Sequence, residues 1–515
     1  MANRRAVLIA MIFAVAMMFI DQTIVVLAVP DLQHDLGVTA TGAQWILNGY
    51  LLALSALFAL GGKLADVLGH RRMVLVGVIA FATFSALCGA TPTGDIGEAW
   101  MIFFRVLQGA SAALLFPAAL AIVVAAYPVR ERGKALALFF AASGGLTAVG
   151  PLAGGYLTEW TWRAIFWINV PVAIIAVVLT LRAKIPDTRH PAKIDYRGAV
   201  LISAAMGLVV LGLQQAGVWG WDDPRTWACI VVGLLLLVGF VLNQLRVPNP
   251  LIEMRIFLQR AFSADNVVLF LISAVFVPLF FFASVYAQAS LGEDASSAGV
   301  YLLYFFLGFA VASQIGGRIL DERGAKPSVV IGCIVAAAGF VLWGRSLPDM
   351  ELSSQWYWIV LAGAGMGLVL GPVSTDAVNR APRTSYGEVT GITQTVRNFG
   401  ASLGLAIMGS VFVTENVRRV TDTLEARGLP AARAEAIAHS LSSANAASSG
   451  GGGGGADSAI YQAVQLDIAH STQVIAFAMA GIMVVAFVVA RIGMPRGRVE
   501  EQILADEDPE PAAAG

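Results

Sequence analysis

The stretch GGKLADVLGHRR at Gly61–Arg72 returns as GGRILDERGAKP at Gly316–Pro327, at an offset of 255 residues. Five positions are identical or carry the same charge in the two copies: Gly61/Gly316, Gly62/Gly317, Lys63/Arg318, Asp66/Asp321 and Gly69/Gly324. Each copy is a short charged segment between two long apolar runs. A repeat of this kind predicts two membrane-embedded halves of one design, which is an organisation typical of transporters.

The composition excludes a soluble multidomain enzyme. Of 515 residues, 57% are hydrophobic and 13% are charged, and the mean hydropathy is +0.75. Soluble proteins carry about a quarter charged residues. The three cysteines all lie in apolar runs, so they predict neither a disulfide framework nor a metal site. A net charge of −1 without a long basic tract predicts no nucleic-acid partner.

Fourteen apolar runs approach the roughly 20 residues that a membrane helix needs. They lie near residues 6–29, 43–62, 73–91, 100–122, 133–157, 164–182, 196–217, 226–243, 261–289, 297–318, 326–345, 355–379, 387–413 and 472–492. The first run follows Arg4 and Arg5 as a signal peptide would. It continues to about Val29 without a small-residue cleavage pattern, so we interpret it as an uncleaved span.

The basic residues predict the orientation of these spans. With the N-terminus inside, 24 of the 33 Lys and Arg residues fall in cytoplasmic segments and seven fall outside. This asymmetry is the positive-inside pattern, and it predicts that both termini are cytoplasmic. Both copies of the charged repeat then face the cytoplasm, so the halves are parallel repeats.

The predicted fold is an all-α membrane protein with two six-helix bundles and two connecting helices. The predicted divisions are a first bundle at 1–185, a connecting pair at 186–250, a second bundle at 251–495 and a cytoplasmic tail at 496–515. A long exterior loop at 414–471 contains the amphipathic stretch Thr421–Leu441 and a flexible linker, Gly450–Gly455.

Several segments, in order along the chain, resemble the drug:proton antiporters with fourteen spans in the major facilitator superfamily. They are FIDQTIVVLAVPDLQHDLG, QWILNGYLLALSALFALGGKLADVLGHRR, RVLQGASAALLFPAAL, AVGPLAGGYLTEWTWRAIFWINVPV, YAQASLGEDASSAG and GITQTVRNFGASLGLAIMGSV. The resemblance implies the major facilitator fold, transport driven by the proton gradient without a cofactor, and a bacterial plasma membrane location. The chain departs from the family's loop motif at Val67 and His70, where basic residues are usual.

Asp21 and Arg105 are the candidates for proton coupling. Each is a charged residue within a predicted span, and a charge at the centre of a span costs roughly 2.5–3.5 kcal/mol on insertion scales. They lie at similar depths in the first and fourth spans, so a direct or water-bridged contact is expected. The resemblance links Arg105 to proton handling. The alternatives are a static ion pair near the exterior mouth and a structural polar contact.

The charged loops are candidates for a gating latch that breaks and re-forms as the halves rock. Asp66 and Asp321 precede a helix whose N-terminal dipole favours an anion. We expect Lys63, Arg71 and Arg72 to pair with Asp66 or with a neighbouring helix. Glycines permit the tight turn. The alternative is ordinary topogenic charge. The candidate latch residues are Gly62, Lys63, Asp66, Gly69, Arg71 and Asp321.

The fifth predicted span matches the family's antiporter motif at Gly150, Pro151, Gly154 and Gly155. Small residues four apart let helices pack closely, and proline bends the axis. Close packing explains these residues by itself, so the antiport role is what the resemblance implies.

The candidate substrate-pocket residues are aromatic or polar: Trp45, Tyr50, Phe281, Tyr286, Gln288 and Arg397. An apolar, aromatic pocket with few polar groups suits drug-like substrates. Aromatic residues near helix ends are also common as interfacial anchors. Arg397 either binds a polar group or bridges helices, and Asp376 either caps a helix or pairs with Arg380.

The predicted function is export of hydrophobic or cationic drugs in exchange for protons, by a protein that acts as a monomer. The alternatives are a dedicated exporter of an endogenous lipid, siderophore or self-made antibiotic, and a non-transporting scaffold or receptor. A scaffold needs neither the buried charges nor the paired loops. The sequence contains no P-loop and no nucleophile–base constellation, so neither ATP-driven transport nor an enzyme is predicted.

Overall fold

The computed structural model describes residues 4–127, 129–183, 185, 194–379, 386–443 and 456–497, and their regular structure is helical throughout. Thirteen helices in this part of the chain are long and apolar enough to cross a membrane. The predicted span at 133–157 falls on a further helix, α6, of 32 residues. Each of the fourteen predicted spans therefore falls on helical residues, and the all-α membrane fold is confirmed.

The sixth predicted span consists of two consecutive helices, α7 and α8, and a short helix, α2, follows the first span. The helices of the first half are α1 (Arg4–Leu27), α2 (Val29–Leu36), α3 (Ala40–Leu68), α4 (His70–Gly89), α5 (Gly97–Ala126), α6 (Val129–Trp160), α7 (Ala164–Trp167) and α8 (Asn169–Arg182). Those that follow are α9 (Tyr196–Trp219), α10 (Pro224–Gln244), α11 (Arg260–Ala289), α12 (Ala295–Arg323), α13 (Ala325–Ser346), α14 (Trp356–Asn379), α15 (Tyr386–Ala426), α16 (Ala431–Ser443) and α17 (Ala456–Gly493). Three short 3₁₀ turns lie at η1 (Met254–Leu258), η2 (Leu347–Asp349) and η3 (Leu352–Ser354).

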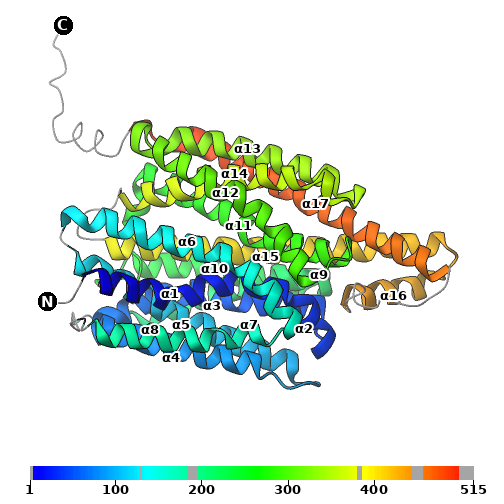
Figure 1. The fold of residues 1–515 in the computed structure, drawn as a ribbon, viewed down its shortest axis with the longest axis horizontal. Helices are drawn as coiled ribbons and strands as arrows, with labels where there is room; N and C mark the ends of the chain where they lie inside the picture. Colours follow the sequence, from blue (N-terminus) through cyan, green and yellow to red (C-terminus); the bar gives the residue numbers. More distant parts are fainter. Residues whose placement is uncertain are drawn as a thin grey trace, which may run out of the picture.

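The helices of the two halves pack in corresponding pairs. In the first half α1 packs on α6 and α8, α5 packs on α3 and α4, and α4 packs on α8. In the second half α11 packs on α15 and α17, α14 packs on α12 and α13, and α13 packs on α17. Figure 1 shows α12, α13, α14 and α17 on one side of the molecule and α4, α5 and α8 on the other. This correspondence is what a parallel repeat predicts, and the residue limits of the two bundles remain a prediction.

The repeated loop has the same backbone role in both halves. Gly69 ends α3 and begins α4 with φ +104°, and Gly324 joins α12 to α13 with φ +81°. Only glycine adopts such angles readily. About two turns earlier, a Cβ on Gly61 would overlap a carbonyl oxygen of α5, and one on Gly316 would lie 3.1 Å from Pro372 of α14. Both copies therefore require glycine for a turn and for close helix packing.

The connecting pair joins the halves on one side. α9 packs on α10 and also contacts α3 and α15. At this junction the Asn48 and Gln214 amide groups lie 2.6 Å apart, and the Ser402 hydroxyl donates to Asn48. All three side chains are buried, so each half and the connecting pair contribute to one polar contact.

The segment predicted as an exterior loop at 414–471 is helical in most of its described residues. α15 continues to Ala426, α17 begins at Ala456, and α16 lies between them. Figure 1 shows α16 at the end of the molecule to which α15 and α17 extend. Apolar side chains from the three helices pack together at Val420, Leu424, Ala434, Ala438, Val464 and Ile468. The amphipathic pattern therefore buries its apolar face within the segment, while the predicted linker Gly450–Gly455 lies outside the described residues.

Candidate functional site

Asp21, Arg105 and Gln108 form a buried polar cluster inside the first half. Arg105 Nη1 lies 2.5 Å from Asp21 Oδ2 and 2.7 Å from Gln108 Oε1. Gln108 Nε2 donates to Asp21 Oδ1 at 2.9 Å. The three residues are 0%, 1% and 0% exposed. Both oxygens of the carboxylate therefore accept a hydrogen bond, and the charge of Asp21 is matched by that of Arg105.

A third helix fixes Arg105 independently of Asp21. Arg105 Nε donates to the Ile46 carbonyl oxygen of α3 at 2.9 Å, and the guanidinium lies 4.5 Å from the centre of the Tyr50 ring. α3 and α5 approach closely here because Gly109 has no side chain, and a Cβ on it would overlap the Tyr50 carbonyl. The arginine is thus held by α3 and α5, while its carboxylate partner comes from α1.

The contacts within this cluster depend on the charge of Asp21, and its role in proton coupling stays a prediction. A buried carboxylate that loses its charge gives up an ion pair, and one that regains the charge recovers it, so the two protonation states differ in their contacts with Arg105. The hydrogen bond from Arg105 Nε to the Ile46 carbonyl oxygen does not involve Asp21. The cluster therefore joins a carboxylate on α1 to a cation that α3 and α5 hold.

The loop residue Asp66 has a different partner from the expected ones. Its Oδ1 lies 3.1 Å from His70 Nε2, one helical turn later. In the described residues no ion pair joins Asp66 to Lys63, Arg71 or Arg72. His70 reaches the carboxylate because Gly69 turns the chain sharply between the two helices.

The remaining latch candidates lie at helix ends. Asp66 lies in the last turn of α3, ahead of α4. Asp321 lies in the last turn of α12, ahead of α13. Asp321 is exposed. A Cβ on Gly62 would lie 3.7 Å from Pro117 of α5, which is ordinary contact. The structure thus places Asp66 and Asp321 beside the turns and Gly62 inside α3, and their gating role stays a prediction.

The antiporter-motif residues bring α6 against two helices. A Cβ on Gly150 would overlap Thr23 Oγ1 of α1, and one on Gly154 would lie 3.0 Å from Ile24 of the same helix. One on Gly155 would lie 2.7 Å from Ser296 of α12. The motif therefore packs α6 on α1 within its own half and on α12 of the other half.

The two halves also meet at the ends of α1, α6, α11 and α12 that are predicted to be exterior. Gln288 Nε2 of α11 donates to the Leu27 carbonyl oxygen of α1 at 3.3 Å. At Gly299 of α12, a Cβ would lie 2.5 Å from the Pro151 carbonyl oxygen. At that end, α11 and α12 of the second half therefore contact α1 and α6 of the first half.

The structure places the substrate-pocket candidates on three helices: Phe281, Tyr286 and Gln288 on α11, Trp45 and Tyr50 on α3, and Arg397 on α15. Tyr50 lies beneath Arg105 in the core of the first half, whereas Tyr286 belongs to the core of the second half and donates to the Leu347 carbonyl oxygen at 2.8 Å. Gln288 bridges α11 and α1. Phe281 is buried and Trp45 is partly exposed. Their role in substrate binding stays a prediction.

Arg397 is partly exposed, and its Nη1 donates to Gln394 Oε1 at 3.0 Å on the same helix. In the described part of the chain, no carboxylate forms an ion pair with it. Asp376 is 1% exposed near the end of α14, and its expected partner Arg380 lies outside the described residues.

The sequence analysis did not predict two of these contacts, that of Gln108 with Asp21 and that of His70 with Asp66. Gln108 lies three residues after Arg105, and this spacing places both on one face of α5. His70 lies four residues after Asp66, at a position where the family motif usually has a basic residue, and this spacing also allows it to contact Asp66. Polar residues at helical spacing from a buried charge were the available signal.

Comparisons with known proteins agree with the helical architecture. A sequence profile of the Major Facilitator Superfamily matches residues 11–405. The tetracenomycin C resistance and export protein of Streptomyces glaucescens is 35% identical over 407 residues, which cover 78% of this chain and 74% of that protein. The puromycin resistance protein of Streptomyces alboniger is 34% identical over 415 residues, covering 78% of this chain and 81% of that protein.

Two further matches extend the comparison. A multidrug transporter protein of Bacillus subtilis is 28% identical over 428 residues, covering 82% of this chain and 78% of that protein. The crystal structure of a bacterial homologue of the human lysosomal transporter Spinster, inward-facing and unoccupied, superposes with a TM-score of 0.65. It covers 95% of this chain and 97% of its own at 16% identity, so it supports the fold alone.

Proposed function

This chain belongs to the Major Facilitator Superfamily and is a membrane-embedded transporter, and from that premise we propose that it exports hydrophobic or cationic drugs in exchange for protons. The observation that carries the proposal is the buried cluster of Asp21, Arg105 and Gln108. The proposed location is the bacterial plasma membrane, with both termini cytoplasmic. The proposed driving force is the proton gradient, without a cofactor.

In the proposed cycle, Asp21 takes up a proton when the halves separate at the exterior end. Protonation removes the carboxylate charge that pairs with Arg105, while Arg105 stays on the Ile46 carbonyl oxygen of α3. α1 then loses its strongest polar link to α3 and α5. This freedom lets the first half change its packing on the second, after which the proton leaves on the cytoplasmic side.

The glycines of α6 have a second role in this proposal. Their packing on α1 and α12 closes the exterior end when Asp21 is charged. A close contact between backbones excludes water, so protons do not cross without substrate. The repeated loops at Gly69 and Gly324 set the turns about which the halves rock.

A second candidate is the dedicated export of one endogenous product, such as a self-made antibiotic. It is favoured by the names of two relatives above 30% identity, which refer to tetracenomycin C and to puromycin. The multidrug transporter of Bacillus subtilis, at 28% identity, favours the broader substrate range.

Growth inhibition separates the two candidates. Cells of a drug-sensitive bacterium that express the chain are tested against chemically diverse dyes, cationic drugs and polyketide or nucleoside antibiotics. Protection against several unrelated classes supports drug export, and protection against one class supports a dedicated exporter. Unchanged inhibition by every compound, with the protein present in the membrane, would contradict both. Asp21→Asn serves as the matched inactive variant.

A further inference from the structure

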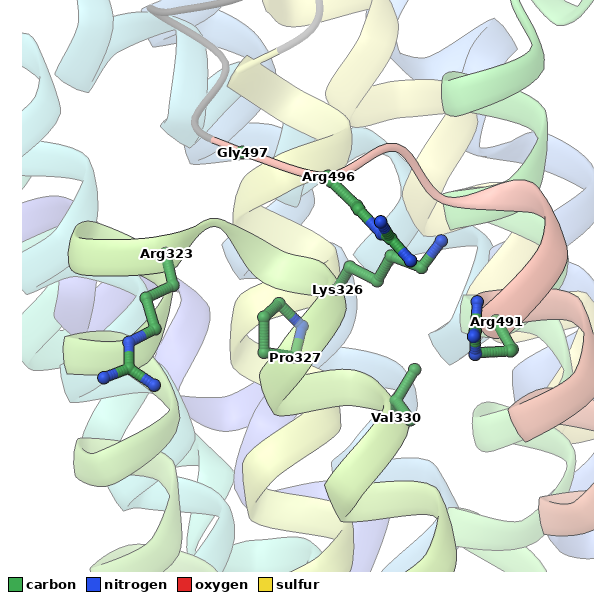
Figure 2. Close-up of a pocket in the computed structure, with 7 residues that line it drawn as sticks. All are labelled: Arg323, Lys326, Pro327, Val330, Arg491, Arg496 and Gly497. Carbon is green, nitrogen blue, oxygen red and sulfur yellow. The ribbon is translucent and has the colours of Figure 1, made fainter.

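A basic cavity lies where α12, α13 and the end of α17 meet. Its volume is about 330 Å³, and its lining residues are Arg323, Lys326, Pro327, Val330, Arg491, Arg496 and Gly497. Figure 2 shows the charged ends of Lys326, Arg491 and Arg496 on one side of Pro327 and that of Arg323 on the other. Among the residues that the structure describes, the lining contains four cations and no acidic residue.

The positive charge of this cavity exceeds the charge that would neutralise the C-terminal end of α17. Lys326 Nζ donates to the Met494 carbonyl oxygen at 2.7 Å, and the nearby Arg260 donates to that of Ile492 at 2.9 Å. These bonds cap the C-terminal end of α17, which carries about half a negative charge. Lys326 keeps two further N–H donors. Helix capping therefore accounts for a minor part of the positive charge.

The local backbone adds to the attraction for an anion. α13 begins at Ala325 beside the cavity, and no side chain caps its N-terminus. The amide groups of a first helical turn and the helix dipole both favour a negative group. The acidic residues closest in sequence, Asp321 and Glu322, are exposed and do not line the cavity.

The surface below the cavity is apolar. On α13, Ile334 lies one turn after the lining residue Val330 and is 53% exposed. On α17, Val488 and Val484 precede Arg491 by about one and two turns and are 45% and 52% exposed. α13 and α17 pack on each other, so these side chains continue from the cavity towards the middle of the membrane.

We propose that this cavity binds the phosphate group of an anionic phospholipid in the cytoplasmic leaflet, with its acyl chains along α13 and α17. A free phosphate also carries negative charge, but it has no acyl chains to contact the apolar surface. The site contains Arg323 and Lys326 of the second repeated loop, so an occupied site ties that loop to the end of α17. The proposal is independent of the exported substrate.

The test measures binding of short-chain lipids to the purified full-length protein in a neutral detergent. The probes are dioctanoyl phosphatidylglycerol, dioctanoyl phosphatidylcholine and inorganic phosphate, titrated while bound lipid is counted by native mass spectrometry. A basic residue near an anionic surface contributes about 1 kcal/mol, or about fivefold in affinity. We therefore expect a loss of about fivefold for Lys326→Gln or Arg491→Gln and about 25-fold for the double variant.

The matched control is Arg246→Gln, which removes an exposed cation after α10 and should leave lipid affinity unchanged. Lys326→Arg preserves the charge and should preserve binding. Thermal unfolding without lipid verifies that each variant is folded. Equal affinity of the wild type and the folded double variant for phosphatidylglycerol would overturn the proposal. So would phosphate or phosphatidylcholine binding as tightly as phosphatidylglycerol.

Discussion

Arg105 Nη1 lies 2.5 Å from Asp21 Oδ2, and neither residue is more than 1% exposed. The two residues are 84 positions apart on α5 and α1, so their contact ties two helices of the first half together. Removing one member of a buried ion pair leaves an unmatched charge, which costs about 3–5 kcal/mol.

The first prediction concerns stability. Arg105→Leu should lower the unfolding temperature strongly, because it leaves the Asp21 carboxylate buried without its cation. The double variant Asp21→Asn/Arg105→Leu should be more stable than Arg105→Leu alone, since contacting residues are not additive. Thermal unfolding in detergent measures both. Arg225→Leu, which breaks an exposed pair with Asp223, should change little. Equal losses for the single and double variants would contradict the pairing.

Gln108 donates a hydrogen bond to the Asp21 carboxylate but is not itself the proposed proton carrier. Removing Gln108 should therefore affect transport differently from removing Asp21. Gln108→Leu should slow proton-driven transport but keep a measurable response to a pH gradient, because Arg105 still bonds to Asp21. Ser111→Ala is the matched control one turn later, where the hydroxyl bonds to the Leu107 carbonyl oxygen. Dye flux in liposomes compares the variants. A complete loss of gradient response in Gln108→Leu would assign the proton to a different arrangement.

Packing between the halves gives a third prediction. Gly299→Ala places a Cβ 2.5 Å from the Pro151 carbonyl oxygen, so α6 and α12 must move apart. We expect about 1–3 kcal/mol of destabilisation and slower transport. Gly481→Ala on α17 is the control, because no atom lies within 4 Å of the added Cβ. If both variants unfold and transport alike, α6 and α12 do not need this contact.

The start of α12 gives a prediction for pH. The Ser297 backbone amide donates to Asp294 Oδ1 at 2.7 Å, and this hydrogen bond lowers the pKa of the Asp294 carboxyl. A lowered pKa means that the cap stabilises the folded state above the unfolded value, near pH 4, and loses this effect as the pH falls through the folded pKa.

Asp294→Ala should therefore cost about 1 kcal/mol at pH 7 and less at pH 3. Unfolding measured at both pH values tests this, and Asp294→Asn should keep most of the cap at either pH. A loss for Asp294→Ala that does not change with pH would rule out the carboxylate cap.

The sequence predicted the membrane fold because long apolar runs and the repeated loop are local signals. The positions of Asp21 and Arg105 in two apolar runs also predicted that they would meet, since unpaired charges are costly there. The hydrogen bond of Gln108 could be inferred only from helical spacing. The sequence did not predict the partner of Asp66, because the turn at Gly69 decides which side chain reaches it.

The sequence did not distinguish pocket residues from core residues. Aromatic residues such as Tyr50 and Tyr286 suit both a binding surface and a helix core, and composition does not separate the two. Their burial in different halves depends on helix rotation, which is set by the whole bundle. The sequence predicted a loop at 414–471, where α15 continues to Ala426 and α17 already begins at Ala456. Polar residues end the apolar runs there, but the helices extend beyond those runs.

Proton coupling at Asp21 is tested most directly with purified protein in sealed liposomes carrying an imposed pH gradient. Wild-type protein should concentrate a transported dye against its gradient, and the dye movement should dissipate the pH difference. Asp21→Asn should still bind dye and exchange it down its concentration gradient, but it should not concentrate it. If Asp21→Asn concentrates dye as the wild type does, Asp21 is not the coupling residue.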